Sequence, residues 1–190
     1  MSELYPYDYK GYPAGLSYPW SFPMFTEKER DLRWDAIRRA MQQNDLDCLI
    51  VGAAFGYMPS ARHLYYIANY FPYFNRGTFA VFPLLGEPQL EVSNYLGPQF
   101  FHVASEVSWI RDIVGSLDPV QAMVEKIRQL KLEKGRIGIV GYKSGMFSAS
   151  VYDTLRESLP VATYLDASAV LGEAMNKVSR ASEEELAMLQ

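Results

Sequence analysis

The chain has 190 residues, of which 49% are hydrophobic and 21% are charged, and these proportions suit one globular domain. A formal net charge of −4 leaves no excess of basic residues for phosphates, so we expect no nucleic acid as a partner. No apolar run approaches the roughly 20 residues that span a bilayer, and the N-terminus lacks the order of a secretory signal. The single cysteine, Cys48, excludes an internal disulfide. These features predict a cytoplasmic protein without a membrane partner.

A Tyr- and Pro-rich N-terminal arm makes up residues 1–25, where the prolines forbid a continuous helix. Two interpretations stay open for it: a loosely ordered leader, or an aromatic arm that packs on its own domain or on a neighbour. A helix then begins at a capping box formed by Thr26 and Glu29, and Asn44 is predicted to end it. The apolar residues on one face of this helix are Trp34, Ile37, Ala40 and Met41.

The segment "DCLIVGA" is typical of a buried strand and contains Cys48. We expect a structural role for this thiol, because no basic neighbour would lower its pKa. Residues 59–77 predict a short helix to about Tyr66 and then an aromatic loop broken by Pro72. The strands "TFAVFPL" and "QLEVSN" follow around the turn "LGEP".

The middle of the chain is ambiguous over residues 99–117, where we expect a strand near 102–104 and then a short helix near Trp109. The next helix is clearer, because Asp118 caps it before a proline and Gly135 is predicted to end it. Its buried stripe is expected to be Val120, Met123, Val124, Ile127 and Leu130.

Strands and helices alternate in the last third of the chain. After the strand "RIGIVG", either Ser148 or Ser150 opens a helix with Val151, Leu155 and Leu159 inward. The strand "VATYLD" then leads to a helix capped by Asp166. This alternation predicts an α/β domain with helices on both faces of the sheet.

The tail "KVSRASEEELAMLQ" looks like the first turns of another helix. Ser182 and Glu185 have the spacing of a capping box, and Leu186 and Leu189 follow at helical spacing. A helix of about eight residues is too short to be stable by itself in water. We therefore expect residues past about Ser182 to fray or to pack against something non-native.

Candidate reactive groups are few. His63 and His102 sit in no metal-ligand spacing, and each is expected to be an ordinary hydrogen-bonded histidine. The stretch "GIVGYKSG" (138–145) lies where phosphate loops occur but lacks their glycine pattern, so a tight strand-to-helix turn is expected. Ser144 is not in a nucleophile-elbow motif.

The stretch "FNRG" (74–77) has two interpretations. An arginine beside aromatic residues on a loop can bind a carboxylate through two hydrogen bonds while the rings exclude water. Alternatively, Arg76 is an exposed arginine near the start of a strand. The residues alone favour the second interpretation.

The order of elements resembles the N-terminal domain of the creatinase/prolidase/aminopeptidase P family. The stretch "EKERDLRWDAIRRAMQQNDLDCLIV" resembles that domain's opening helix and first strand, and "SARHLYYIANY" stands where the family has its "YltGf" segment. The run from "KGRIGIVG" to "SEEELAML" resembles its close. The chain departs from the family pattern in "YYIANY", without Thr-Gly, and in "VSRASEEEL", which replaces a Lys-Ser-Pro junction.

The resemblance implies a three-layer domain with a mixed β-sheet flanked by helices over residues 26–178. Residues 179–190 would be the junction to, and the start of, a C-terminal "pita-bread" catalytic domain that these 190 residues do not contain. The family's metal ligands lie in that domain, so the resemblance implies no catalytic residue, metal or cofactor in this chain. For the C-terminal domain two alternatives stay open: divalent metal, as in the family's peptidases, or a metal-free histidine mechanism, as in creatinase.

The resemblance also implies partners and a site. N-terminal domains of this family form subunit contacts, so a homodimer is expected, and they border the partner's active site. Phe74 and Arg76 match a Phe-x-Arg spacing that reaches a substrate carboxylate in creatinase-like members, which implies a peptide or a small carboxylate as substrate.

Three functions remain in order of preference. The first is the non-catalytic N-terminal domain of a creatinase/prolidase-like hydrolase, Xaa-Pro peptidase-like, which is inactive by itself. The second is a free-standing small-molecule or protein-interaction domain without a catalytic partner. The third is an independent enzyme with an unrecognised site, which is weak because no acid–base constellation is visible.

Overall fold

A computed structural model describes residues 25–53, 58–72, 77–94, 99–143, 147–179 and 182–187. The strands are β1 (Cys48–Ala53), β2 (Thr78–Pro83), β3 (Gln89–Ser93), β4 (Asp112–Ser116), β5 (Arg136–Val140) and β6 (Thr163–Asp166). The helices are α1 (Glu27–Gln43), α2 (Met58–Ala68), α3 (Gln99–Val107), α4 (Pro119–Gln129), α5 (Ala149–Ser158), α6 (Ser168–Ser179) and α7 (Glu183–Ala187). Among these helices, none combines the length and the apolar character that a membrane span requires.

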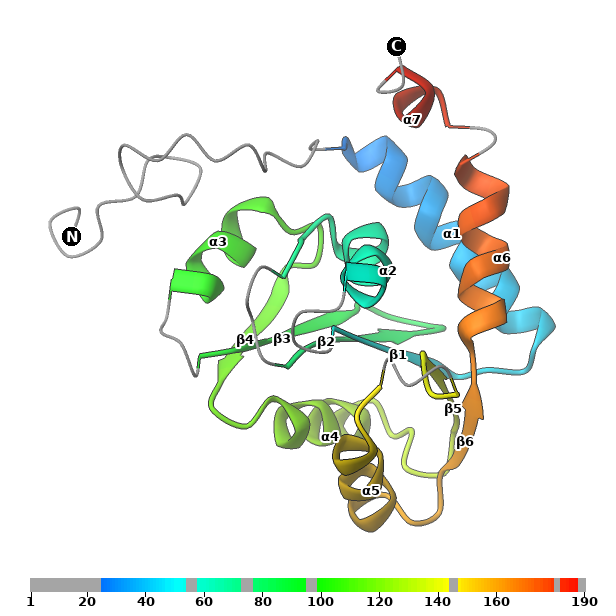
Figure 1. Ribbon diagram of the computed structural model, residues 1–190. Coiled ribbons are helices and arrows are strands. Elements are labelled where there is room, and N and C mark those ends of the chain that lie inside the picture. The colour runs from blue at the N-terminus through cyan, green and yellow to red at the C-terminus, as the bar shows by residue number, and fades with distance from the viewer. Residues whose placement is uncertain are drawn as a thin grey trace, which may run out of the picture.

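The strands form one six-stranded sheet in the order β4-β3-β2-β1-β5-β6. The hairpin strands β2 and β3 are antiparallel to each other, and β2 is antiparallel to β1, whereas β1/β5, β5/β6 and β3/β4 are parallel pairs. Helices α1, α2, α3 and α6 cover one face of the sheet, and α4 and α5 cover the other (Figure 1). The predicted three-layer α/β domain with a mixed sheet is therefore confirmed.

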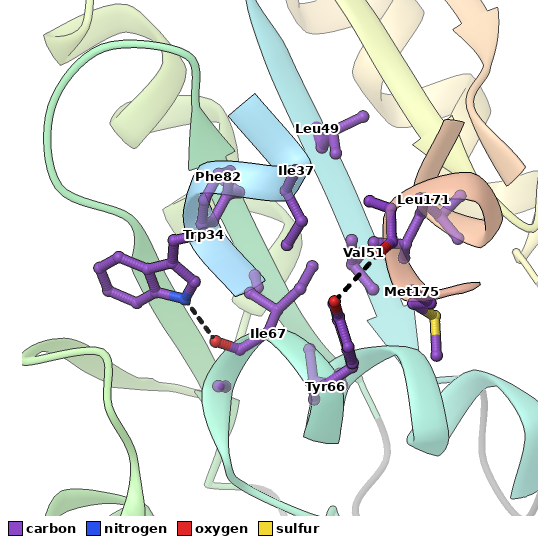
Figure 2. Packing of buried hydrophobic residues seen from close by; sticks show 14 of the residues in the cluster. Trp34, Ile37, Leu49, Val51, Tyr66, Ile67, Phe82, Leu171 and Met175 are labelled. Atoms are coloured by element: carbon purple, nitrogen blue, oxygen red, sulfur yellow. Dashed lines mark hydrogen bonds between the residues drawn. The ribbon is translucent and has the colours of Figure 1, made fainter. Parts of the chain in front are cut away.

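The larger core lies under α1, α2 and α6 (Figure 2). Its aromatic side chains bury their polar atoms only with a partner: the Trp34 indole donates to the carbonyl of Ile67 at 2.8 Å, and the Tyr66 hydroxyl donates to the carbonyl of Ala174 at 3.4 Å. Such partners are needed because an unpaired polar atom in the core costs about 1–3 kcal/mol. These two bonds tie α1 to α2 and α2 to α6.

The predicted helix starts are confirmed. The Thr26 hydroxyl accepts from the Glu29 amide at 3.5 Å, and the Asp118 carboxylate accepts from the Gln121 amide at 3.0 Å. The Asp166 carboxylate likewise accepts from the amide of the first residue of α6. Of the two candidates for opening α5, Ser148 is the capping residue, although its hydroxyl makes no bond to the helix backbone.

The prediction for residues 99–117 is wrong in both parts. A helix, α3, occupies the predicted strand, because Ala104 and the residues a turn away from it pack on the core. The predicted helix near Trp109 is instead irregular chain with a bend at Trp109. The Trp109 amide and the Ser108 hydroxyl both donate to the carbonyl of Ala68, so α2 holds this segment in place.

The end predicted for α4 is also wrong. The helix stops at Gln129 rather than near Gly135. Lys131, with φ of +60°, adopts the left-handed conformation that commonly follows a helix, and its amide donates to the carbonyl of Arg128. Lys131, and not Gly135, therefore adopts the left-handed conformation that ends the helix.

Replacement by alanine is expected to change stability in opposite directions at two glycines. A Cβ atom at Gly138 would lie 2.7 Å from the Cβ of Ala167 and 2.8 Å from a methyl of Leu49, so Gly138→Ala should cost about 1–3 kcal/mol. A Cβ atom at Gly172, inside α6, meets nothing within 4 Å, so Gly172→Ala should stabilise the domain by about 0.5–1 kcal/mol. Urea unfolding midpoints measure both effects, and a shift of the same sign in the two variants would contradict this packing.

Candidate functional site

The two residues predicted to bind substrate, Phe74 and Arg76, lie outside the described residues. The described chain resumes at Gly77, whose φ is +79°, and β2 begins at the next residue. A Cβ atom at Gly77 would lie 3.3 Å from the ring of Pro119, so the start of β2 sits against the start of α4. The roles of Phe74 and Arg76 stay predictions.

The other candidate reactive groups from the sequence are Cys48, His63, His102 and Ser144. Cys48 is fully buried, and this burial raises the pKa of its thiol to about 12, so it is not a nucleophile. His63 is half-buried in α2, where burial and the charge of Arg62 lower its pKa. His102 lies within α3, and Ser144 lies outside the described residues. The described part of the chain brings together no three His, Cys, Asp or Glu side chains able to hold a metal ion.

The most unusual polar group of the described structure is Arg33, whose side chain is 1% exposed. Its guanidinium carbon lies 4.1 Å from the ring centroid of Phe25, 4.7 Å from that of Tyr66 and 5.4 Å from that of Trp109. Aromatic faces attract a cation, and the attraction grows when water is excluded. Three rings from three parts of the chain thus surround one positive charge.

Two carboxylates neutralise that charge. The Nε of Arg33 donates to Glu29 at 2.7 Å, and an Nη donates to Glu185 at 2.9 Å. The second oxygen of Glu29, which is as buried as Arg33, accepts from the Ser182 hydroxyl at 2.7 Å. We call the four residues Glu29, Arg33, Ser182 and Glu185 the arginine clamp. Every strong electrostatic contact in it is also a hydrogen bond, which is the condition under which a buried ion pair is tolerated.

The arginine clamp holds the C-terminal segment on the domain. The Ser182 hydroxyl accepts from the Glu185 amide at 3.2 Å and so caps α7 as predicted. The Glu184 carboxylate accepts from both the amide and the hydroxyl of Thr26 at the start of α1. The expectation that this segment frays is therefore wrong for residues 182–187, because α7 packs on α1. The alternative, packing on a non-native surface, stays a prediction.

Both predicted capping boxes are used in an unexpected way. In each, the serine or threonine caps the helix, but the glutamate binds Arg33 instead of returning to the capping residue's amide. One signal could have revealed this: Arg33 precedes Ile37 by four residues and therefore lies on the apolar face of α1. Its pairing with Glu29 at i−4 was visible in the sequence as well.

The clamp offers structural rather than catalytic chemistry, since a guanidinium with no exposed surface cannot contact a substrate. The clamp joins α1 to α7, and the rings of Tyr66 and Trp109 around Arg33 add α2 and the Trp109 segment to the same contact. In Figure 1, α7 lies beside the start of α1 and the end of α6, so Thr26 and the final helix of the described chain are neighbours.

Comparisons with known proteins agree on the type of domain. The family model for the Creatinase/Prolidase N-terminal domain matches residues 33–174, well over half of the chain. Similar solved structures include an aminopeptidase P from Streptococcus thermophilus, with a TM-score of 0.58 and 17% identity over 77% of this chain and 98% of that chain. An Xaa-Pro aminopeptidase from Streptococcus pyogenes has a TM-score of 0.61 and 15% identity over 78% of this chain and 99% of that one.

Another similar structure belongs to a much longer chain. The prolidase from Pyrococcus horikoshii superposes with a TM-score of 0.52 and 16% identity over 73% of this chain, but over just 33% of its own length. No curated protein matches the sequence. At these identities the solved structures establish a shared fold, while the family model establishes membership. The chain belongs to the Creatinase/Prolidase N-terminal domain family.

Proposed function

We propose that the chain is the non-catalytic N-terminal domain of a creatinase/prolidase-like hydrolase of the Xaa-Pro peptidase kind. In this proposal the domain serves subunit association in a homodimer and borders the partner's active site, where it helps to bind a peptide or small carboxylate substrate. The observation that carries the proposal is the family match over residues 33–174. The chain spans 33% of the prolidase from P. horikoshii and 38% of the dipeptidase PepE from Mycobacterium ulcerans, which supports a second domain as the place of the chemistry.

Two of the polar or reactive groups among the described residues are enclosed and not open to a substrate. Arg33 is enclosed by its clamp, and the Cys48 thiol is buried. In this proposal a divalent metal would belong to the C-terminal domain, as the family resemblance implies, and we derive no metal-dependent step here. The arginine clamp holds α7 against α1. In this proposal the chain would pass into the C-terminal domain at α7, so the clamp would help to fix the position of that junction.

The experiment uses the protein with its catalytic domain. Arg76→Ala should raise KM for an Xaa-Pro dipeptide about 10- to 100-fold with little change in kcat, because a charge-assisted hydrogen bond to the substrate carboxylate contributes about 1.5–3 kcal/mol. The matched control is Arg62→Ala, which removes an exposed arginine on α2 and should leave KM unchanged.

Two outcomes contradict the proposal at different points. An unchanged KM in the Arg76→Ala enzyme removes the substrate-binding role and leaves the domain assignment standing. Hydrolysis of Xaa-Pro dipeptides by the 190-residue chain alone, assayed with added Mn²⁺ or Co²⁺, removes the assignment as a non-catalytic domain.

A further inference from the structure

A second buried polar cluster lies on the opposite face of the sheet, under α4. Glu91 stands in the middle of β3, opposite Phe79 of β2 and Val114 of β4, and it is 0% exposed. Phe79 belongs to the core that Met123 of α4 completes, so the Glu91 side chain points at this helix. Neither carboxyl oxygen of Glu91 has a hydrogen-bond partner among the described residues. A buried carboxyl group without partners is tolerated only in its neutral form.

The charged groups around Glu91 come from two elements. Strand β4 contributes Asp112, and α4 contributes Glu125 and Lys126, whereas β2 contributes the uncharged Phe79. Lys126 is the cation of this group, but its Nζ lies 2.7 Å from the carboxylate of Asp112. That carboxylate also accepts from the Gln89 side chain at 2.8 Å. Lys126 and Asp112 therefore pair with each other, and Glu91 is left without a cation of its own.

These surroundings place the titration of Glu91 near neutrality. Burial, with the charge of Asp112 as the next cause, raises the pKa of Glu91 to about 8, and Lys126 offsets part of this effect. The ionised carboxylate needs water or a donor. Strand β2 is hydrogen-bonded to strands on both sides, and β4 is hydrogen-bonded to β3 along its whole length, whereas α4 contacts the sheet through side chains. The element that can make room is therefore α4.

Helix α4 is fastened at its ends and by its apolar face. The amide of its capping residue, Asp118, donates to the Ser116 hydroxyl at 2.9 Å, and near the other end Arg128 donates to the carbonyl of Ser158 at 2.9 Å. Between these ends, Met123, Val124 and Ile127 rest on the sheet. The Lys126–Asp112 pair lies at the border of this contact and is partly exposed, so solvent can compete for it.

We propose that α4 is a pH-sensitive cover of the sheet, which is held closed while Glu91 is protonated and loosened when Glu91 ionises. On ionisation the carboxyl proton leaves to solvent, and α4 moves away from β3 so that water reaches the carboxylate. The open form exposes the apolar residues of α4 and the sheet surface beneath them. The face of the sheet under α1 and α6 does not take part.

Amide hydrogen exchange of the whole chain, followed by mass spectrometry, tests this cover. Between pH 6 and pH 9, protection of α4 amides, corrected for the intrinsic exchange rate, should fall more than tenfold, because the open form no longer holds the proton of Glu91. Protection of α6, on the other face, should exceed that of α4 at every pH, because α6 exchanges only when the whole domain unfolds. In Glu91→Gln, which keeps the shape and removes the charge, protection of α4 should not depend on pH.

A second variant keeps the test decisive if Glu91→Gln folds poorly. Asp112→Asn removes the carboxylate that disfavours ionisation of Glu91 and frees Lys126, so the fall in protection should move to lower pH. The proposal is overturned if wild-type α4 is equally protected at pH 6 and pH 9. It is also overturned if the fall persists unchanged in Glu91→Gln, or if Asp112→Asn leaves its midpoint in place.

Discussion

Replacing Arg33 by methionine is expected to lower the free energy of unfolding by about 3–5 kcal/mol, because removal of one partner strands a buried charge. In this variant Glu29, which is 1% exposed, keeps the Ser182 hydroxyl but loses its cation. The three rings around the guanidinium lose their central contact as well. For a domain of this size the melting temperature should fall by about 6–20 °C, which calorimetry or circular dichroism measures.

The matched control is an exposed ion pair of the same length. Lys177 lies 2.7 Å from Glu173, as Arg33 does from Glu29, but its side chain is 59% exposed, so Lys177→Met should change stability by no more than about 0.5 kcal/mol. Combining Arg33→Met with Glu29→Leu should recover much of the loss, since it also removes the fully buried carboxylate, while Glu185, whose side chain is 23% exposed, is left where water reaches it. If Arg33→Met proves as mild as Lys177→Met, the clamp does not stabilise the domain.

The whole domain is expected to become less stable as the pH rises from about 5 to about 9. The folded state holds the proton of Glu91 up to a pKa of about 8, whereas the unfolded chain releases it near 4.5. Between these values the folded state binds more protons, so the free energy of unfolding falls with rising pH and levels off above about 8. The shift corresponds to a loss of about 5 kcal/mol, a large part of the total stability of a typical domain.

Urea unfolding at intervals of pH measures this loss, and Glu91→Gln is the control. The neutral glutamine has no proton to release, so the variant should be nearly independent of pH in this window and more stable than wild type at pH 9. Parallel pH profiles for the two proteins would assign the dependence to another group. A wild-type profile that rises between pH 5 and pH 8 would contradict the burial of an unpaired Glu91.

The sequence predicts elements best where local signals agree. In α4, the capping Asp118, the following proline and the apolar stripe all indicate the same helix, and the structure contains it. Residues 99–107 carry mixed signals: phenylalanine and valine favour strands, while the spacing of Phe101, Ala104 and Val107 favours a helix. Packing on the core decided between them, and a single sequence cannot weigh that contribution.

The polar sites depend on contacts that are remote in sequence. Arg33 and Glu185 are 152 positions apart, and Ser182 and Glu29 are 153 apart, so no local pattern could pair them. Glu91 looks like an ordinary outward residue of an alternating strand until α4 is placed over it. Phe74 and Arg76 rest on a family spacing, which the structure leaves as a prediction.

The arginine clamp has a consequence for how the protein is made. A ribosome delivers Glu29 and Arg33 among the first residues of the domain, but Ser182 and Glu185 only after all six strands have been synthesised. Until then, the amphipathic face of α1 carries a cation whose second carboxylate does not yet exist. Of the described helices, α1 is thus synthesised first but acquires its full set of contacts only when α7, the last of them, has been synthesised.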